Sequence, residues 1–264
     1  MKHFKIFIFS AFALVSAVTL RTIQLLFLTD SKTGFYKQGM EGVGTALMVL
    51  VIAVIAAAST LVFLFKKESI SPTPTSSALL GCAALFAGIA NAAEPFLNSI
   101  SLSSVPTALL GLRTVLIIAS GAIFCWYGLA ILFRAELHAS LSLVLVVTWV
   151  VRLMSSFICF TGMSNISENL YDVLMLISTL IFLLFFGKAV CKISKSQTHR
   201  KLFASGVAAV LFTSASSVPC LIAYFAGDFA FVHTPVDNPI TGIFMAFFIS
   251  VYLVEICRRK SKNA

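Results

Sequence analysis

Eight apolar stretches, each long enough to cross a lipid bilayer as a helix, constrain this sequence more than any other feature. A spanning helix needs roughly 20 mostly apolar residues. The stretches cover residues 4–29, 43–65, 78–97, 107–133, 139–160, 169–190, 202–226 and 240–257, with short connections between them. We therefore predict an all-α polytopic transmembrane helix bundle of eight spans, in which residues 1–264 form a single integral membrane domain.

The composition agrees with this class. Hydrophobic residues make up 59% of the chain and charged residues only 11%, against roughly one quarter charged in soluble domains. The net charge of +9 alone would suit nucleic acid, but no polar module exists that could present a phosphate-binding patch. The expected partner is the lipid bilayer, and no nucleic acid.

The positions of the basic residues predict the orientation of the spans. With the N-terminus inside, fourteen of the 19 lysines and arginines fall on the cytoplasmic side, and only Lys32 and Lys37 fall outside. Cytoplasmic loops carry such an excess of basic residues. We therefore expect both termini to be cytoplasmic and the protein to reside in the cell (cytoplasmic) membrane.

The first span has an alternative interpretation. Residues 1–17 combine a basic start, an apolar run and small residues before a potential cleavage site, as a secretory signal does. Cleavage there would leave seven spans and would not change the orientation of the others. The apolar run continues to Leu28, however, which is long for a signal and suits a span.

Three arginines lie inside the spans. Counted from the predicted outer helix ends, Arg21, Arg113 and Arg152 are each six to eight residues deep, which is roughly 9–12 Å at 1.5 Å per residue. An arginine at the centre of a membrane helix costs roughly 2.5–3.5 kcal/mol on insertion scales. Polar partners or water must therefore accompany them.

Polar residues that could serve as partners lie near the same depth. Gln24 follows Arg21 by three residues, Asn91 and Glu94 have the same spacing, and Asp172 lies near the outer start of its span. Guanidinium groups form paired hydrogen bonds to carboxylate or phosphate, and three positive charges against two negative ones leave room for an anion. We predict an outward-facing polar cavity with ligand-binding residues Arg21, Gln24, Asn91, Glu94, Arg113, Arg152 and Asp172.

The seventh span carries a second polar feature. Thr213, Ser214, Ser216 and Ser217 precede Pro219, and a proline inside a helix removes a backbone hydrogen bond and bends the helix. We expect a kink there, with backbone carbonyls available to line a cavity.

No pattern for catalysis, metal or cofactor binding is present. Tyr171-Asp172 and Gly227-Asp228 are similar to the aspartate pairs of intramembrane aspartyl proteases, but Phe225 stands where that family needs glycine. No histidine lies in a span to act as a base, and the six cysteines form no C-x-x-C pair. We predict no catalytic residue, no metal and no cofactor.

The stretch from Arg21 to Phe27, with Asp30 and then Thr33-Gly34-Phe35-Tyr36, resembles one that recurs in an uncharacterised family of bacterial polytopic membrane proteins. The resemblance covers about the first forty residues and implies a bacterial inner-membrane protein, without an activity. Locally, Thr33-Gly34 predicts a turn into the second span, followed by two interfacial aromatic residues.

Three functions remain open. The first is binding or secondary transport of a small anionic or zwitterionic solute. The second is a non-transporting sensor or structural subunit, in which the buried charges fix helix packing against a membrane protein partner or within a homo-oligomer. The third is a lipid-handling enzyme that uses the arginines on a phosphate.

Overall fold

The structure is a computed structural model that describes residues 2–30, 35–65, 77–97, 106–133, 135, 139–160, 167–191, 196–227 and 238–263. Over this part of the chain the regular structure is helical, apart from one isolated bridge between Thr29 and Tyr36. Eight helices are long and apolar enough to cross a membrane. The predicted all-α bundle of eight spans is confirmed.

The helices are α1 (Lys2–Ile23), α2 (Glu41–Phe65), α3 (Ala78–Leu97), α4 (Thr107–Phe133), α5 (Ala139–Phe160), α6 (Ser167–Val190), α7 (Ser196–Phe225) and α8 (Pro239–Asn263), and a short π-helix, η1 (Gln24–Leu28), extends α1. The bounds of α3, α4 and α5 agree with the sequence prediction. The first span differs, because its last turns form a π-helix where a continuous α-helix was expected. The seventh span begins earlier than predicted.

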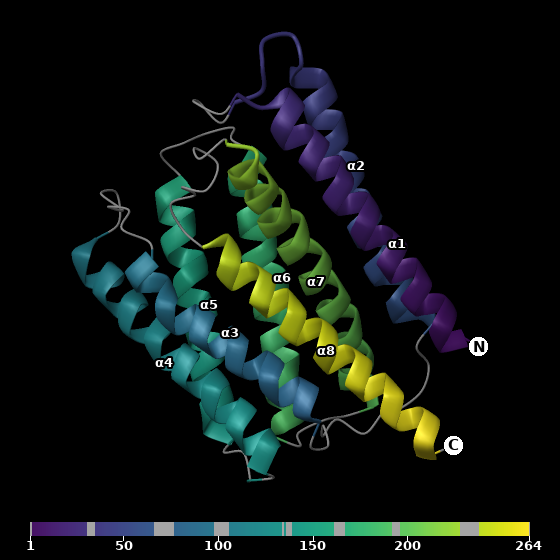
Figure 1. Ribbon diagram of the computed structural model, residues 1–264, viewed down its shortest axis with the longest axis vertical. Helices are drawn as coiled ribbons and strands as arrows, with labels where there is room; N and C mark the ends of the chain where they lie inside the picture. The colour runs from purple at the N-terminus through teal and green to yellow at the C-terminus, as the bar shows by residue number, and fades with distance from the viewer. Residues whose placement is uncertain are drawn as a thin grey trace.

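The helices are arranged around α7. It is the most buried span, and 67% of its apolar 18-residue stretch lies inside the bundle. Helices α1 and α2 run side by side along one flank and pack against α7, while α6 and α8 pack against its other sides. Helices α3, α4 and α5 complete the opposite flank (Figure 1). The two ends of the chain lie at the same end of the bundle (Figure 1).

Glycines bring α3 and α4 into close contact. Gly88 on α3 and Gly121 on α4 face each other, and a Cβ atom on either one would lie 2.7 Å from the carbonyl oxygen of the other. Gly81 and Gly128, one heptad away on each helix, form a second such contact. Without glycine at these positions the two backbones could not approach so closely, as is usual for tightly packed membrane helices.

An aromatic cluster fills part of the interior where α4, α5, α6 and α8 meet. Its rings have centroid separations of 5.2–6.3 Å, mostly in edge-to-face geometry, the arrangement that aromatic pairs prefer. Helices α4, α5, α6 and α8 contribute Phe124, Tyr127, Trp149, Phe182, Phe186, Phe248 and Tyr252. The interior at this level is therefore closed by rings.

The chain has an irregular helical turn at a place that the sequence did not indicate. Helix α7 continues through Pro219 to Phe225, so the chain is not interrupted at the proline. The irregular backbone lies instead in η1, directly after Arg21 and Ile23. Because π-turns often accompany functional sites, this position draws attention to the polar side chains around Arg21.

Candidate functional site

The predicted site residues are all buried, but they lie in separate groups. The exposed fraction of none of the seven residues exceeds 6%. Arg21 and Gln24 form one hydrogen-bonded cluster, and Arg152, Arg113, Asn91 and Glu94 form another. A hydrogen bond from Ser216 joins Asp172 to α7. These contacts join several different pairs of helices.

In the first group, the Arg21 cluster, Gln24 is the central residue. Arg21 Nη1 donates to Gln24 Oε1 at 2.8 Å, and the Tyr171 hydroxyl donates to the same oxygen at 3.4 Å. Gln24 Nε2 donates to the Tyr36 hydroxyl at 2.5 Å and to the carbonyl of Gly44 at 3.0 Å. The Arg21 guanidinium also lies 4.1 Å from the centroid of the Tyr171 ring, a cation–π contact. One amide therefore connects α1, α2 and α6.

The backbone around η1 positions Tyr36 in this cluster. After the π-turn the chain forms the bridge between Thr29 and Tyr36, and the amide of Asp30 donates to the carbonyl of Phe35 at 2.8 Å. The Tyr36 ring then packs on α2 where Gly44 has no side chain; a Cβ there would lie 2.7 Å from Tyr36 Cζ. The predicted turn at Thr33-Gly34 lies outside the described residues.

In the second group, the Arg152 cluster, Glu94 lies between two arginines. Arg152 forms an ion pair with Glu94 Oε2, and Arg113 Nη2 lies 3.7 Å from Glu94 Oε1. Arg152 Nη1 also donates to Asn91 Oδ1 at 2.9 Å, and the amide nitrogen of Asn91 donates to the carbonyl of Ala87 at 2.8 Å. The cluster links α3, α4 and α5, and the paired hydrogen bonds of Arg152 fix its guanidinium plane.

Asp172 connects α6 to α7. Its Oδ1 accepts a hydrogen bond of 2.6 Å from the hydroxyl of Ser216. The preceding residue, Tyr171, belongs to the Arg21 cluster, so consecutive residues of α6 contact different neighbours. The serine lies in the polar run before Pro219, which therefore takes part in the buried network even though the helix is not interrupted there.

A small cavity of about 20 Å³ lies against Arg152. Threonines from three other helices line it, Thr179 of α6, Thr213 of α7 and Thr241 of α8, and Trp149 and Met245 contribute apolar surface. A space of this size holds one water molecule. Along α5, α6 and α8 the cavity lies between the arginine layer and the aromatic cluster.

Sequence reasoning missed several polar members of this interior. Tyr36 was interpreted as an interfacial aromatic residue, and Tyr171 was considered only beside Asp172; their hydroxyls in fact reach Gln24. The lining threonines Thr179 and Thr241 were not predicted to belong to a site. A single hydroxyl in an apolar helix carries little signal, because it can bond to the preceding turn of its own helix.

Among the described residues, no group of three or more histidine, cysteine or acidic side chains is arranged to hold a metal ion. The chain has no match among protein-family models, curated proteins or solved structures. The chemistry of the buried clusters is therefore the basis for assigning a function.

Proposed function

We propose that the chain binds a small anionic or zwitterionic solute in the polar half of its bundle, the half that holds the buried arginines, and carries it across the membrane as a secondary transporter. The position of Arg152 carries this proposal: its guanidinium is buried, yet it lines a cavity together with threonines from three other helices. Arginine only donates hydrogen bonds, so a carboxylate or phosphate oxygen suits the cavity better than a cation does.

The size of the cavity defines which conformation the structure represents. At about 20 Å³ it accommodates one water molecule, so a carboxylate-bearing solute requires the surrounding helices to separate. In this proposal the structure is the closed, unliganded state, in which Glu94 forms ion pairs with Arg113 and Arg152. A solute would replace the carboxylate, and it shifts the equilibrium only by its preference for the open state.

The position of the aromatic cluster supports access from one side. Phe124, Phe182, Phe186 and Phe248 pack directly beyond the cavity, toward the other end of the bundle. The buried arginines and carboxylates lie on the other side of that cluster. A polar half closed at its inner end suits a site that opens to one side at a time.

The seven candidate residues have different roles in this proposal. Arg152 and Arg113 contact the solute, Glu94 competes with it, and Asn91 orients Arg152. The other three position helices: Arg21 and Gln24 hold α1 against α6, and Asp172 holds α6 against α7.

The test is a thermal-shift screen of the purified protein in a mild detergent against acetate, succinate, inorganic phosphate and glycine, repeated on Thr213→Val. A ligand that binds the native state raises its melting temperature. Thr213→Val removes a hydroxyl from the cavity while leaving both ion pairs of Glu94 in place. A stabilising compound should therefore lose most of its effect in this variant. Its uptake into proteoliposomes would then test transport directly.

The matched control is Thr114→Val on α4. The hydroxyl of Thr114 bonds only to the carbonyl of Leu110 within its own helix at 3.0 Å, and the residue does not line the cavity. The control should keep the ligand-dependent shift. If no compound stabilises the parent protein, or if both variants respond as the parent does, the solute site is refuted.

A second candidate function is a non-transporting membrane sensor or structural subunit. One observation favours it: the hydrogen bonds and the ion pair around Arg21 and Arg152 join helices that are distant in sequence. Under this function Glu94→Gln should chiefly destabilise the protein, since removing one partner of a buried ion pair costs about 3–5 kcal/mol. A melting temperature that barely changes in Glu94→Gln would contradict a purely structural role.

A further inference from the structure

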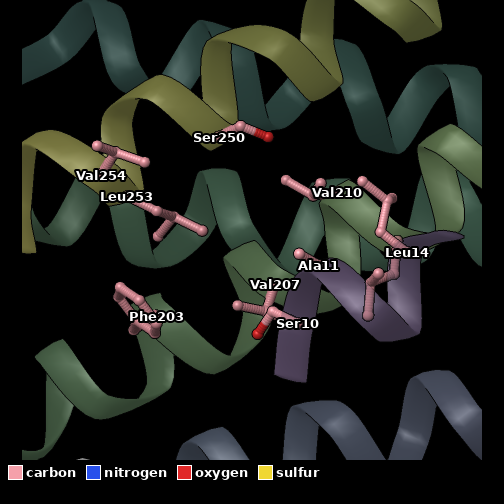
Figure 2. Close-up of a pocket in the computed structure, with 10 residues that line it drawn as sticks. Ser10, Ala11, Leu14, Phe203, Val207, Val210, Ser250, Leu253 and Val254 are labelled. Atoms are coloured by element: carbon pink, nitrogen blue, oxygen red, sulfur yellow. The ribbon is translucent and has the colours of Figure 1, made fainter. Parts of the chain in front are cut away.

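A second cavity lies far from the arginine clusters, in a groove between α1, α7 and α8. It has a volume of about 180 Å³, larger than the roughly 150 Å³ apolar cavity known to hold a benzene molecule. Ser10 and Ala11 of α1 form one wall, Ser250 and Val254 of α8 form the other, and Val207 of α7 lies between them (Figure 2).

The chemistry of the lining suits a hydrocarbon chain with a polar group near it. All the lining residues other than the two serines are apolar. Along α7 the lining extends from Phe203 to Leu211, eight residues or about 12 Å at 1.5 Å per residue, which is the length of part of an acyl chain. The Ser10 hydroxyl is buried and has no hydrogen-bond partner among the described residues, so it can donate to an ester or glycerol oxygen.

The three groove helices are basic at one common end. Lys201 comes two residues before the lining residue Phe203 on α7, Arg258 comes four residues after Val254 on α8, and Lys5 comes five residues before Ser10 on α1. At 1.5 Å per residue these positions are about 3–8 Å along each helix from the groove. At this end the three helices place eight basic positions against one acid, Glu255, the basic ones being Lys2, Lys5, Arg200, Lys201, Arg258, Arg259, Lys260 and Lys262.

The side chains of α7 at this end are well placed for a headgroup. Arg200 donates to the carbonyl of Phe63 at 2.8 Å and stacks on the Phe63 ring at 4.8 Å, which holds it against the last turn of α2. Lys201, beside it, is exposed. A basic residue near the surface attracts anionic lipid, and the apolar groove, which begins two residues further along α7 at Phe203, adds a place for the chain of the same molecule.

From these observations we propose that the groove is a binding site for an anionic phospholipid. One acyl chain lies in the groove against Val207 and Leu253, and the phosphate lies at the basic end near Lys201. The lipid would join α1 to α8 across the surface of α7. This site is separate from the arginine clusters, so it does not depend on the proposed transport function.

The test measures melting temperatures of delipidated protein in a neutral detergent during titration with dioleoyl phosphatidylglycerol or dioleoyl phosphatidylcholine. The parent should be stabilised more by the anionic lipid. Lys201→Gln should weaken this binding about fivefold, equivalent to about 1 kcal/mol per basic residue near the surface. Ala11→Phe, which fills the groove, should remove most of the lipid-dependent shift.

Each variant has a control elsewhere on the protein. Lys37→Gln removes an exposed lysine before α2, outside the groove helices, and Ala57→Phe adds the same ring to an exposed position of α2 outside the groove. Both controls should keep the parental response. Equal stabilisation by the two lipids would overturn the proposal. A lipid-dependent shift that is reduced in Lys201→Gln but unchanged in Ala11→Phe would also overturn the proposal, because the lipid would then adsorb by its headgroup alone.

Discussion

Replacing Gly121 with alanine tests the contact that places α4 against α3. A Cβ at this position would lie 2.7 Å from the carbonyl oxygen of Gly88 and 2.7 Å from the amide nitrogen of Ala92. Ordinary van der Waals contact begins at 3.4 Å, so the two helices must separate by about 0.7 Å. The obstructing atoms belong to the backbone and cannot rotate away.

The expected loss of stability follows from this overlap. Adding a methyl group to a tightly packed interior typically costs about 1–3 kcal/mol. At about 2–4 °C per kcal/mol for a chain of 150–250 residues, the melting temperature should fall by about 2–12 °C. Glu94 lies six residues beyond Gly88 on α3, and Arg113 lies eight residues before Gly121 on α4. The separation should therefore also lengthen the contact between Glu94 and Arg113.

The matched control is Gly111→Ala on the same helix. A Cβ at Gly111 meets nothing within 4 Å, so this variant should match the parent or be stabilised by about 0.4–1 kcal/mol through its less flexible unfolded chain. Melting temperatures of both purified variants in one detergent make the comparison. If Gly121→Ala has the same melting temperature as the parent and as Gly111→Ala, α3 and α4 do not approach as closely as described.

Three further predictions concern other parts of the bundle. Gly44→Ala should crowd the Tyr36 ring, lower the melting temperature by an amount similar to that expected for Gly121→Ala, and expose the η1 region to proteolysis; unchanged melting and proteolysis would contradict the Tyr36 packing. Tyr127→Phe should leave stability equal or greater, because its buried hydroxyl has no hydrogen-bond partner among the described residues, and a clear fall in melting temperature would reveal one. Cysteine introduced at Lys37 should react with a membrane-impermeant maleimide from outside the cell, and cysteine at Lys201 only after permeabilisation, as the predicted orientation requires; the opposite pattern would reverse the bundle.

The spans could be predicted from the sequence because their signal is a free energy summed over about twenty residues. The bounds of α3, α4 and α5 follow directly from apolar length and from the polar residues that end it. The π-helix could not be found in this way, since it changes the hydrogen-bond pattern of apolar residues without changing their hydropathy. The glycine contact between α3 and α4 had a readable sign in the spacing of Gly81 with Gly88 and of Gly121 with Gly128, but glycine spacing alone does not identify the partner helix.

The site shows a similar division. The need for polar partners was accessible from the sequence, because an arginine inside an apolar helix requires them, and the predicted arginines are buried with polar partners. Lateral position was not accessible. Which helices adjoin depends on packing over the whole bundle, so the sequence grouped Arg21 with Arg152 although the hydrogen bonds assign them to different clusters. Tyr171 reaches Gln24 across 147 residues, a pairing that no local pattern reveals.

The sequence separation between Gln24 and Tyr171 has a consequence while the protein is being synthesised. Tyr171 is added to the chain 147 residues after Gln24, which takes about 7–30 s at 5–20 residues per second. During this interval Gln24 is already present beside Arg21, and Tyr36 and Gly44 follow as partners of Gln24. Arg152 has no such delay, because Asn91 and Glu94 precede it in the chain. The polar turn after α1 therefore supplies the first buried arginine with a local partner before α6 is synthesised.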